Sequence, residues 1–181
     1  MSDNFRYRRG DTKPILMVPD SAAPIHVGDL LFQDPTTKKA RTAAAMLNQG
    51  SQTLNQQTLH DLFAGVALQR GGALEPGEVS FNLNPLPGQI VVATAGEFEF
   101  DCAATAFQPG DLVGGCNNAA NTALAPQQVA KVTALANSIG VAVPEAAAIG
   151  QSCTSVVVRI ASTILGGGQQ AAVPGSSSGA V

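Results

Sequence analysis

Apolar and polar residues alternate most clearly in the stretch GQIVVATAGEFEFDCAA, residues 88–104. A β-branched run comes first. The EFEF that follows places phenylalanines on one side and acids on the other, since successive side chains of a strand face opposite ways. Glu97, Glu99 and Asp101 therefore predict a solvated acidic face. The run TSVVVRIASTIL, residues 154–165, predicts another strand, and its apolar length indicates burial on both faces.

Helical periodicity is weaker than this strand pattern. Residues 37–48 and 126–138 are rich in alanine, which favours a helix, but the second segment also fits a strand whose partner would be residues 138–143. Residues 55–62 predict a helical turn. Prolines and glycines in residues 71–88 predict a loop that carries one short strand, EVSFNL. We therefore expect one or two short helices added to a β-rich body.

One short motif occurs twice. VGDLLFQD at residues 27–34 is followed by FAGVALQR at residues 63–70, and PGDLVGGC at residues 109–116 is followed by SIGVAVPE at residues 138–145. In both copies a Gly-Asp-Leu segment comes first, a stretch of variable sequence follows, and a Gly-Val-Ala segment comes last. Strands joined through repeated corners are typical of barrels and sandwiches, so the sequence predicts a mainly β fold with a small β-barrel or β-sandwich body.

The repeated Gly-Asp pairs, Gly28 with Asp29 and Gly110 with Asp111, predict the corners of this scaffold. Glycine can take the positive φ of a tight turn, and an aspartate side chain can accept hydrogen bonds from turn amides. Neither copy has the further glycine and lysine of a phosphate loop or the alternate acids of a calcium loop. We therefore expect structural turns here rather than a ligand site.

The charge is distributed unevenly over the 181 residues, whose net charge is −3. Residues 1–41 hold seven basic and five acidic residues, and the rest of the chain holds three basic and eight acidic ones. This balance argues against nucleic acid as a partner. The sequence has neither an apolar run long enough to span a membrane nor a signal-peptide core, so we expect no membrane partner and synthesis in the cytoplasm.

Residue types that often carry chemistry are sparse. His26 and His60 stand apart from any nucleophile motif and are expected on the surface or in loops. Cys102, Cys116 and Cys153 lack the close spacing of a zinc site and are expected to be buried thiols. The acidic strand face lacks an opposing carboxylate of the kind that a glycosidase needs. The sequence therefore predicts no catalytic, cofactor or metal site, and a protein that is not an enzyme.

The chain divides into three predicted parts. Residues 1–25 are polar and broken by prolines, which predicts an extended N-terminal arm that lies against another surface; residues 26–165 form the body; and residues 166–181 form a Gly/Ser-rich flexible tail. Aromatic and basic side chains alternate in the arm, which suits packing on a partner protein. The expected contact residues are Phe5, Arg6, Tyr7, Arg8 and Arg9.

Residues 63–165, with a looser match from Val27, resemble the capsid cement or head decoration proteins of tailed bacteriophages and prophages. The resemblance is carried by FAGVAL, IVVATAGEFEFDCAATAFQPGDLVGG, SIGVAV and TSVVVRIASTIL. It implies a β-barrel or β-sandwich, assembly into a homotrimer, and attachment to the outside of a shell of major capsid protein. The N-terminal arm, residues 71–88 and the tail depart from the family pattern.

The predicted function is therefore that of a structural cement protein, made in the host cytoplasm and placed on the outer capsid surface of a virion, where it stabilises the head. The alternative is an adhesive or host-binding module displayed on a particle, which the tripeptide Arg9-Gly10-Asp11 and the flexible tail would favour. A small hydrolase that uses the acidic strand is the third and weakest hypothesis.

Overall fold

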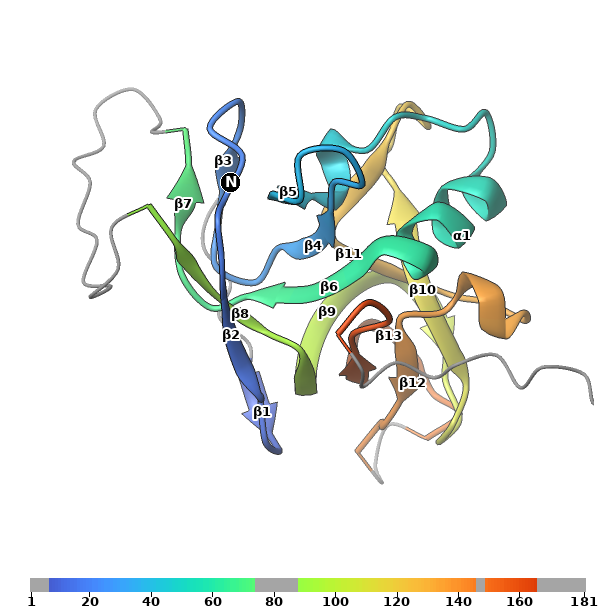
Figure 1. The fold of residues 1–181 in the computed structure, drawn as a ribbon. Helices are drawn as coiled ribbons and strands as arrows, with labels where there is room; N and C mark the ends of the chain where they lie inside the picture. Colours follow the sequence, from blue (N-terminus) through green and yellow to red (C-terminus); the bar gives the residue numbers. More distant parts are fainter. Residues whose placement is uncertain (1–6, 74–87, 146–148, 166–181) are drawn as a thin grey trace, which may run out of the picture.

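The computed structural model describes residues 7–73, 88–145 and 149–165, and the chain in these ranges is mainly β-strand. Figure 1 shows two groups of strands in succession, the first coloured blue to green and the second green to red. The second group closes through strand pairing, and a single bridge joins the ends of the first, so the predicted β-barrel fold is confirmed. The predicted tail, the residues Phe5 and Arg6, and the segment EVSFNL lie outside the described ranges.

The first barrel has the strand order β2-β8-β6-β4-β5. The strands span β2 Pro14–Met17, β4 Leu30–Gln33, β5 Ala40–Thr42, β6 Phe63–Ala67 and β8 Ile90–Ala93. Its two ends meet just beyond β2, where Pro19 forms a parallel bridge with Ala40. The Ala40 amide donates to the Val18 carbonyl at 2.8 Å, and this hydrogen bond helps to close the ring.

The second barrel has the order β9-β11-β10-β12-β13, and β13 pairs again with β9. The strands span β9 Ala95–Ala106, β10 Leu112–Asn117, β11 Leu124–Lys131, β12 Gly140–Ala142 and β13 Ser152–Ala161. All the pairs are antiparallel except β9 with β11, which are parallel. Because β13 pairs with β9, the five strands form a closed ring, and β1 adds to β9 from outside this ring.

The two barrels are equivalent strand by strand. In chain order β2, β4, β5, β6 and β8 correspond to β9, β10, β11, β12 and β13, and each neighbour and each strand direction is the same in the two rings. Even the single parallel contact, Pro19 with Ala40, has its counterpart between β9 and β11. The repeated motif in the sequence therefore belongs to a larger repeat that covers every strand of both barrels.

Other elements attach to these rings. Strand β1, Tyr7–Arg9, adds to β9, and β3, Pro24–Ile25, pairs with β7, Gly71–Gly72. The predicted arm is thus described as strands from Tyr7 onward, and these strands pair with the chain's own body. Helix α1, Gln52–Leu62, precedes β6, as the short 3-10 helix Leu135–Asn137 precedes β12.

Two helix expectations need correction. Residues 37–48 form β5 and the 3-10 helix Ala43–Ala45 in place of an α-helix, because strand pairing overrides the helix propensity of alanine. The alternative strand reading of residues 126–138 holds for β11, but β11 pairs with β10 and β9, so the expected partner at residues 138–143 was wrong.

The core consists of two apolar clusters. The smaller one belongs to the first barrel and contains Met17, Ile25, Leu31, Ala40, Ala64, Ala67, Ile90 and Val92. The larger one joins the second barrel to residues of β4 and β6 that face it, among them Leu30, Phe32, Phe63 and Val66. Alternate residues of β4 therefore serve different clusters, as the period of a strand requires. This shared packing fixes one barrel against the other.

Candidate interaction surfaces

The first Gly-Asp corner is a tight turn at the start of β4. Gly28 has a φ of 93°, and its amide donates to the Ala67 carbonyl at 2.8 Å. The Asp29 carboxylate accepts from the His26 amide at 2.8 Å, while the Ala67 amide donates back to the Asp29 carbonyl at 2.9 Å. The corner therefore fastens the start of β4 to the end of β6.

The second corner repeats this geometry at the start of β10. Gly110 has a φ of 88° and donates to the Ala142 carbonyl at 2.9 Å. The Asp111 carboxylate accepts from the Gln108 amide at 2.7 Å, and the Ala142 amide donates to the Asp111 carbonyl at 2.8 Å. Both aspartates thus act as turn caps. Burial acts to raise the pKa of Asp111, but Lys131 and the Gln108 amide outweigh it and lower the pKa.

The two corners differ in what covers them. Asp29 is 1% exposed, because β11 of the second barrel lies over it and Gln127 Nε2 donates to Asp29 Oδ1 at 2.9 Å. Beside it lies a cavity of about 290 Å³, walled mainly by alanines and prolines, with Thr42 and His26 among its polar residues. The second corner is open by comparison, since Gln108 and Gly110 are exposed.

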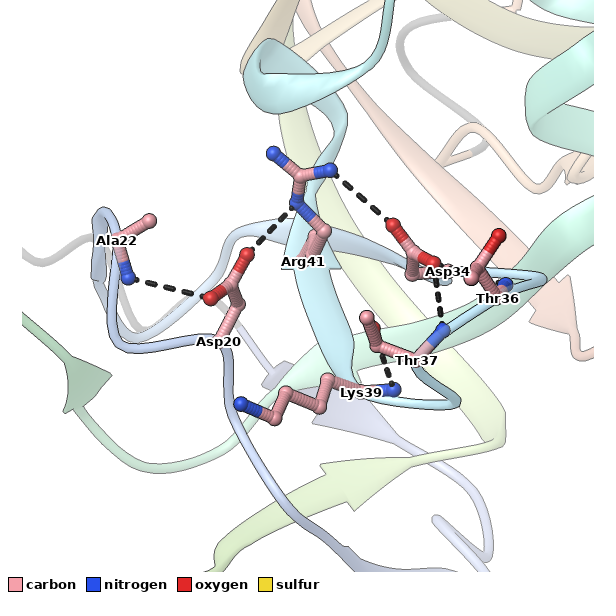
Figure 2. Close-up of polar contacts among 7 residues, drawn as sticks. All are labelled: Asp20, Ala22, Asp34, Thr36, Thr37, Lys39 and Arg41. Atoms are coloured by element: carbon pink, nitrogen blue, oxygen red, sulfur yellow. Dashed lines mark hydrogen bonds and ion pairs between the residues drawn. The ribbon is translucent and has the colours of Figure 1, made fainter.

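The β4–β5 hairpin is a rigid turn built on Asp34 (Figure 2). Asp34 Oδ1 accepts from the amides of Thr36 and Thr37 at 2.9 Å each. The Arg41 guanidinium bridges two carboxylates, because Nη1 donates to Asp34 Oδ2 at 3.1 Å and Nε lies 3.0 Å from Asp20 Oδ2. These contacts hold the exposed tip of the hairpin against the segment that closes the first barrel.

Asp34 makes stability depend on pH. The amides of Thr37 and Thr36 lower its pKa to about 2, below the value of about 3.9 in an unfolded chain. The folded chain therefore binds this proton less readily, so Asp34 stabilises the fold above about pH 4 and that contribution is lost as the pH falls towards 2. In urea titrations at pH 4, 3 and 2, we expect wild type to lose more stability than Asp34→Asn. Parallel losses in the two proteins would contradict this prediction.

Strand β1 brings the basic residues of the N-terminal segment onto the acidic face of β9. Arg8 pairs with Glu99 and Arg9 with Glu97. Arg159 on β13 reaches Glu97 from the other side, with Nη2 donating to Oε1 at 2.7 Å. The three arginine side chains are more than half exposed, whereas the Glu97 side chain is only 7% exposed. We call Arg8, Arg9 and Arg159 the arginine ridge.

This arrangement corrects the expected solvated acidic face, because the arginines cover Glu97 and Glu99. Burial acts to raise the pKa of Glu97, but the hydrogen bonds from Arg9 and Arg159 outweigh it and hold the pKa below its usual value. Glu97 is therefore a structural anion that fastens β1 and β13 to β9. The sequence signal for the pairing was only partial, since Arg8 and Arg9 are adjacent whereas Glu97 and Glu99 alternate, and an irregularity between Tyr7 and Arg9 brings them together.

Tyr7 anchors the same strand through its ring. Its centroid lies 5.6 Å from that of Phe98, and its hydroxyl donates to the Gly10 carbonyl. The tripeptide Arg9-Gly10-Asp11 forms the exposed turn after β1, with Arg9 on Glu97 and the Asp11 carboxylate accepting from the Lys13 amide at 3.0 Å. Both charged groups of the tripeptide thus have contacts within the chain.

The histidines and cysteines match the expectation only in part: His26 lies in a loop, as expected, but His60 lies in α1 and the cysteines are only half-buried. His26 and His60 are buried, at 6% and 8% exposure, because the second barrel covers the first corner and α1 packs on the segment before β12. His60 Nδ1 lies 2.5 Å from the Ser138 carbonyl oxygen. The three cysteines are half-buried free thiols, and burial is the main cause that raises the pKa of Cys102 to about 12.

The described residues contain no cluster of three or more side chains that could hold a metal ion. In the same part of the chain, no helix is long and apolar enough to cross a membrane. Comparisons with protein-family models, with curated proteins and with solved structures find no match for this chain.

Proposed function

We propose that this protein is a structural cement protein that binds the outer surface of a bacteriophage major capsid protein lattice and stabilises the head. It acts as a homotrimer without enzymatic activity, and neither nucleic acid nor membrane is its partner. The proposal starts from the motif resemblance of residues 63–165 and is supported by the barrels on which these motifs lie.

The observation that carries the proposal is the arginine ridge. A protein that must bind many copies of a lattice needs contact groups that are already ordered, because immobilising a long side chain on binding costs about 0.5–1.5 kcal/mol. Glu97 and Glu99 bind the guanidinium groups of the ridge and hold them in place, while the arginine side chains stay more than half exposed. Such groups can donate hydrogen bonds to carboxylates of a partner protein.

Self-association strengthens this binding in the proposal. A single ridge makes a small contact, but several copies held together engage several lattice sites at once and gain through effective concentration. The two barrels support such use, because their common core makes them one stiff unit that positions the ridge. Phe5 and Arg6 precede the ridge in sequence and remain proposed contact residues.

The proposal is tested by co-sedimentation with empty shells of the major capsid protein encoded near the gene for this chain. Wild type should sediment with the shells, and Arg8→Gln/Arg9→Gln should bind at least about tenfold more weakly, as expected when charged contacts are lost. Lys13→Gln/Arg70→Gln is the matched control, because it removes the same charge outside the ridge and outside the β4–β5 hairpin.

The ridge variant should lose shell binding without losing its fold. Arg8 and Arg9 are exposed, so glutamine at both positions should leave the barrels folded, as circular dichroism would show. Equal binding of the ridge variant and wild type would remove the ridge from the contact. Absence of wild-type protein from the shell pellet would count against the proposed function itself.

A further inference from the structure

One carboxylate oxygen distinguishes the second corner from the first. In the first corner, Asp29 Oδ2 caps the turn and Oδ1 accepts from Gln127 of the second barrel at 2.9 Å. In the second corner, both partners of Asp111 use Oδ2, namely the Gln108 amide at 2.7 Å and Lys131 Nζ at 2.5 Å. Within the described ranges, no donor uses Asp111 Oδ1. The acceptor that joins the barrels at the first corner is thus open at the second.

Strand register identifies the residue that corresponds to Gln127. Leu31 of β4 pairs with Thr42, and its equivalent in β10, Val113, pairs with Lys131. Thr42 therefore corresponds to Lys131. Four residues before each of them in sequence stand Lys38 in the first repeat and Gln127 in the second, so Lys38 is the counterpart of Gln127. Lys38 is exposed at the tip of the β4–β5 hairpin, and its longer side chain ends in a cation. A cation there is a stronger donor for a carboxylate than the amide of Gln127.

The hairpin is basic, and the open corner presents a carboxylate. Residues 34–41 of the hairpin hold three basic residues and one acid, and at the corner Lys131 pairs with Asp111 through Oδ2, not Oδ1. The contacts of Asp34 and Arg41 already fix the hairpin, so little order would be lost when it meets a partner. Gln127 belongs to the second barrel and binds the corner of the first, so the corresponding contact of the first barrel's hairpin would be made with the corner of a second barrel.

We propose that the β4–β5 hairpin of one copy docks on the open corner of a second copy, with Lys38 donating to Asp111 of its neighbour. This contact repeats between chains the contact that Gln127 and Asp29 make within one chain. It is heterologous, since different surfaces of the two copies meet, and we propose that the rotation between copies closes it into a ring rather than an open filament. The inference rests on the self-association named in the proposed function and does not depend on shell binding.

The test measures mass in solution, without shells, for wild type, Lys38→Glu and Asp111→Ala. Wild type should form a closed oligomer, and each variant alone should be a monomer, with association at least about tenfold weaker. The decisive sample is a mixture of the two variants. One partner then supplies an intact hairpin and the other an intact corner, so the mixture should form a dimer with one copy of each.

Lys13→Glu is the control, because it makes the same charge change away from the hairpin, and it should keep the wild-type mass. Circular dichroism checks that each variant is folded. Four results would overturn the proposal: a monomeric wild type at about 100 µM, where a weak specific contact is populated; wild-type mass in either variant; a mixture that stays monomeric; or dissociation by Lys13→Glu. Shell binding is measured separately, so its failure would leave this result standing.

Discussion

Replacing Gly140 by alanine should destabilise the protein by about 3 kcal/mol, because the added methyl group meets the backbone of the neighbouring strand. A Cβ at this position would lie 2.2 Å from the Arg159 carbonyl oxygen and 2.9 Å from its carbonyl carbon. Strands β12 and β13 would have to separate where they form the ring. For a chain of this size we expect the melting temperature to fall by roughly 6–12 °C, measured by differential scanning calorimetry.

Two other glycines provide comparisons for the stability loss expected of Gly140→Ala. Gly65 occupies the equivalent place in β6, where a Cβ would lie 2.0 Å from the Ala93 carbonyl oxygen and where φ is +144°. Its alanine variant should therefore lose at least as much stability. Gly50 has a φ of +89° with open space around it, so its alanine variant bears only the backbone cost of about 1 kcal/mol. A Gly140→Ala protein as stable as Gly50→Ala would contradict the close approach of the strands.

Removing the carboxylate of the buried corner should cost more than removing that of the open one. Asp29→Ala leaves the His26 amide without its buried acceptor and leaves Gln127 with only the Val27 carbonyl at 3.3 Å, and an unsatisfied buried donor costs about 1–3 kcal/mol. We expect a loss of about 3 kcal/mol for this variant. Asp111→Ala removes the cap of a turn whose amides water can reach, so this variant should lose about 1 kcal/mol of stability or less.

The measurement is urea denaturation of monomeric protein, in the Lys38→Glu background so that assembly does not contribute. Asp29 and Asp111 make the same backbone contacts at their corners. The difference between the stability losses of Asp29→Ala and Asp111→Ala therefore measures how much β11 stabilises the first corner by covering it. Equal losses for Asp29→Ala and Asp111→Ala would mean that the second barrel does not stabilise the first corner.

The corners could be predicted from the sequence because their chemistry is local. A glycine with positive φ and an aspartate that caps a turn need only their own neighbours, and GDL and GVA preserve both features in each copy. The full repeat could not be predicted in this way. Strand β2 has four residues and its equivalent β9 has twelve, and they share no motif, so only the pairing pattern reveals the correspondence.

Helix α1 was only partly predictable, because polar side chains carry much of its packing. Asn55 donates to Asn117 Oδ1 at 3.2 Å, and Gln56 donates to the Gly115 carbonyl at 2.7 Å, both in buried positions. A search for apolar periodicity does not detect such a face. One signal was available, since Ser51 caps the helix by accepting from the Leu54 amide at 3.3 Å, and serine is a preferred N-cap residue.

Burial of charged and titratable groups was the least predictable property. His26 and Glu97 lie in stretches that read as surface, but β11 covers the neighbourhood of one and arginines from β1 and β13 cover the other. Both covering elements are distant in sequence from the residues that they bury. The same reason explains why the basic arm, expected to pack on another protein's acids, meets the acids of its own chain from Arg8 onward.

Electron cryomicroscopy of shells mixed with the purified protein tests the central claim of capsid attachment most directly. The account predicts density for paired barrels at regular positions on the outer surface of the shell, with the arginine ridge facing the lattice. Bare shells at protein concentrations that saturate a weak contact, or density confined to the inner surface, would contradict it.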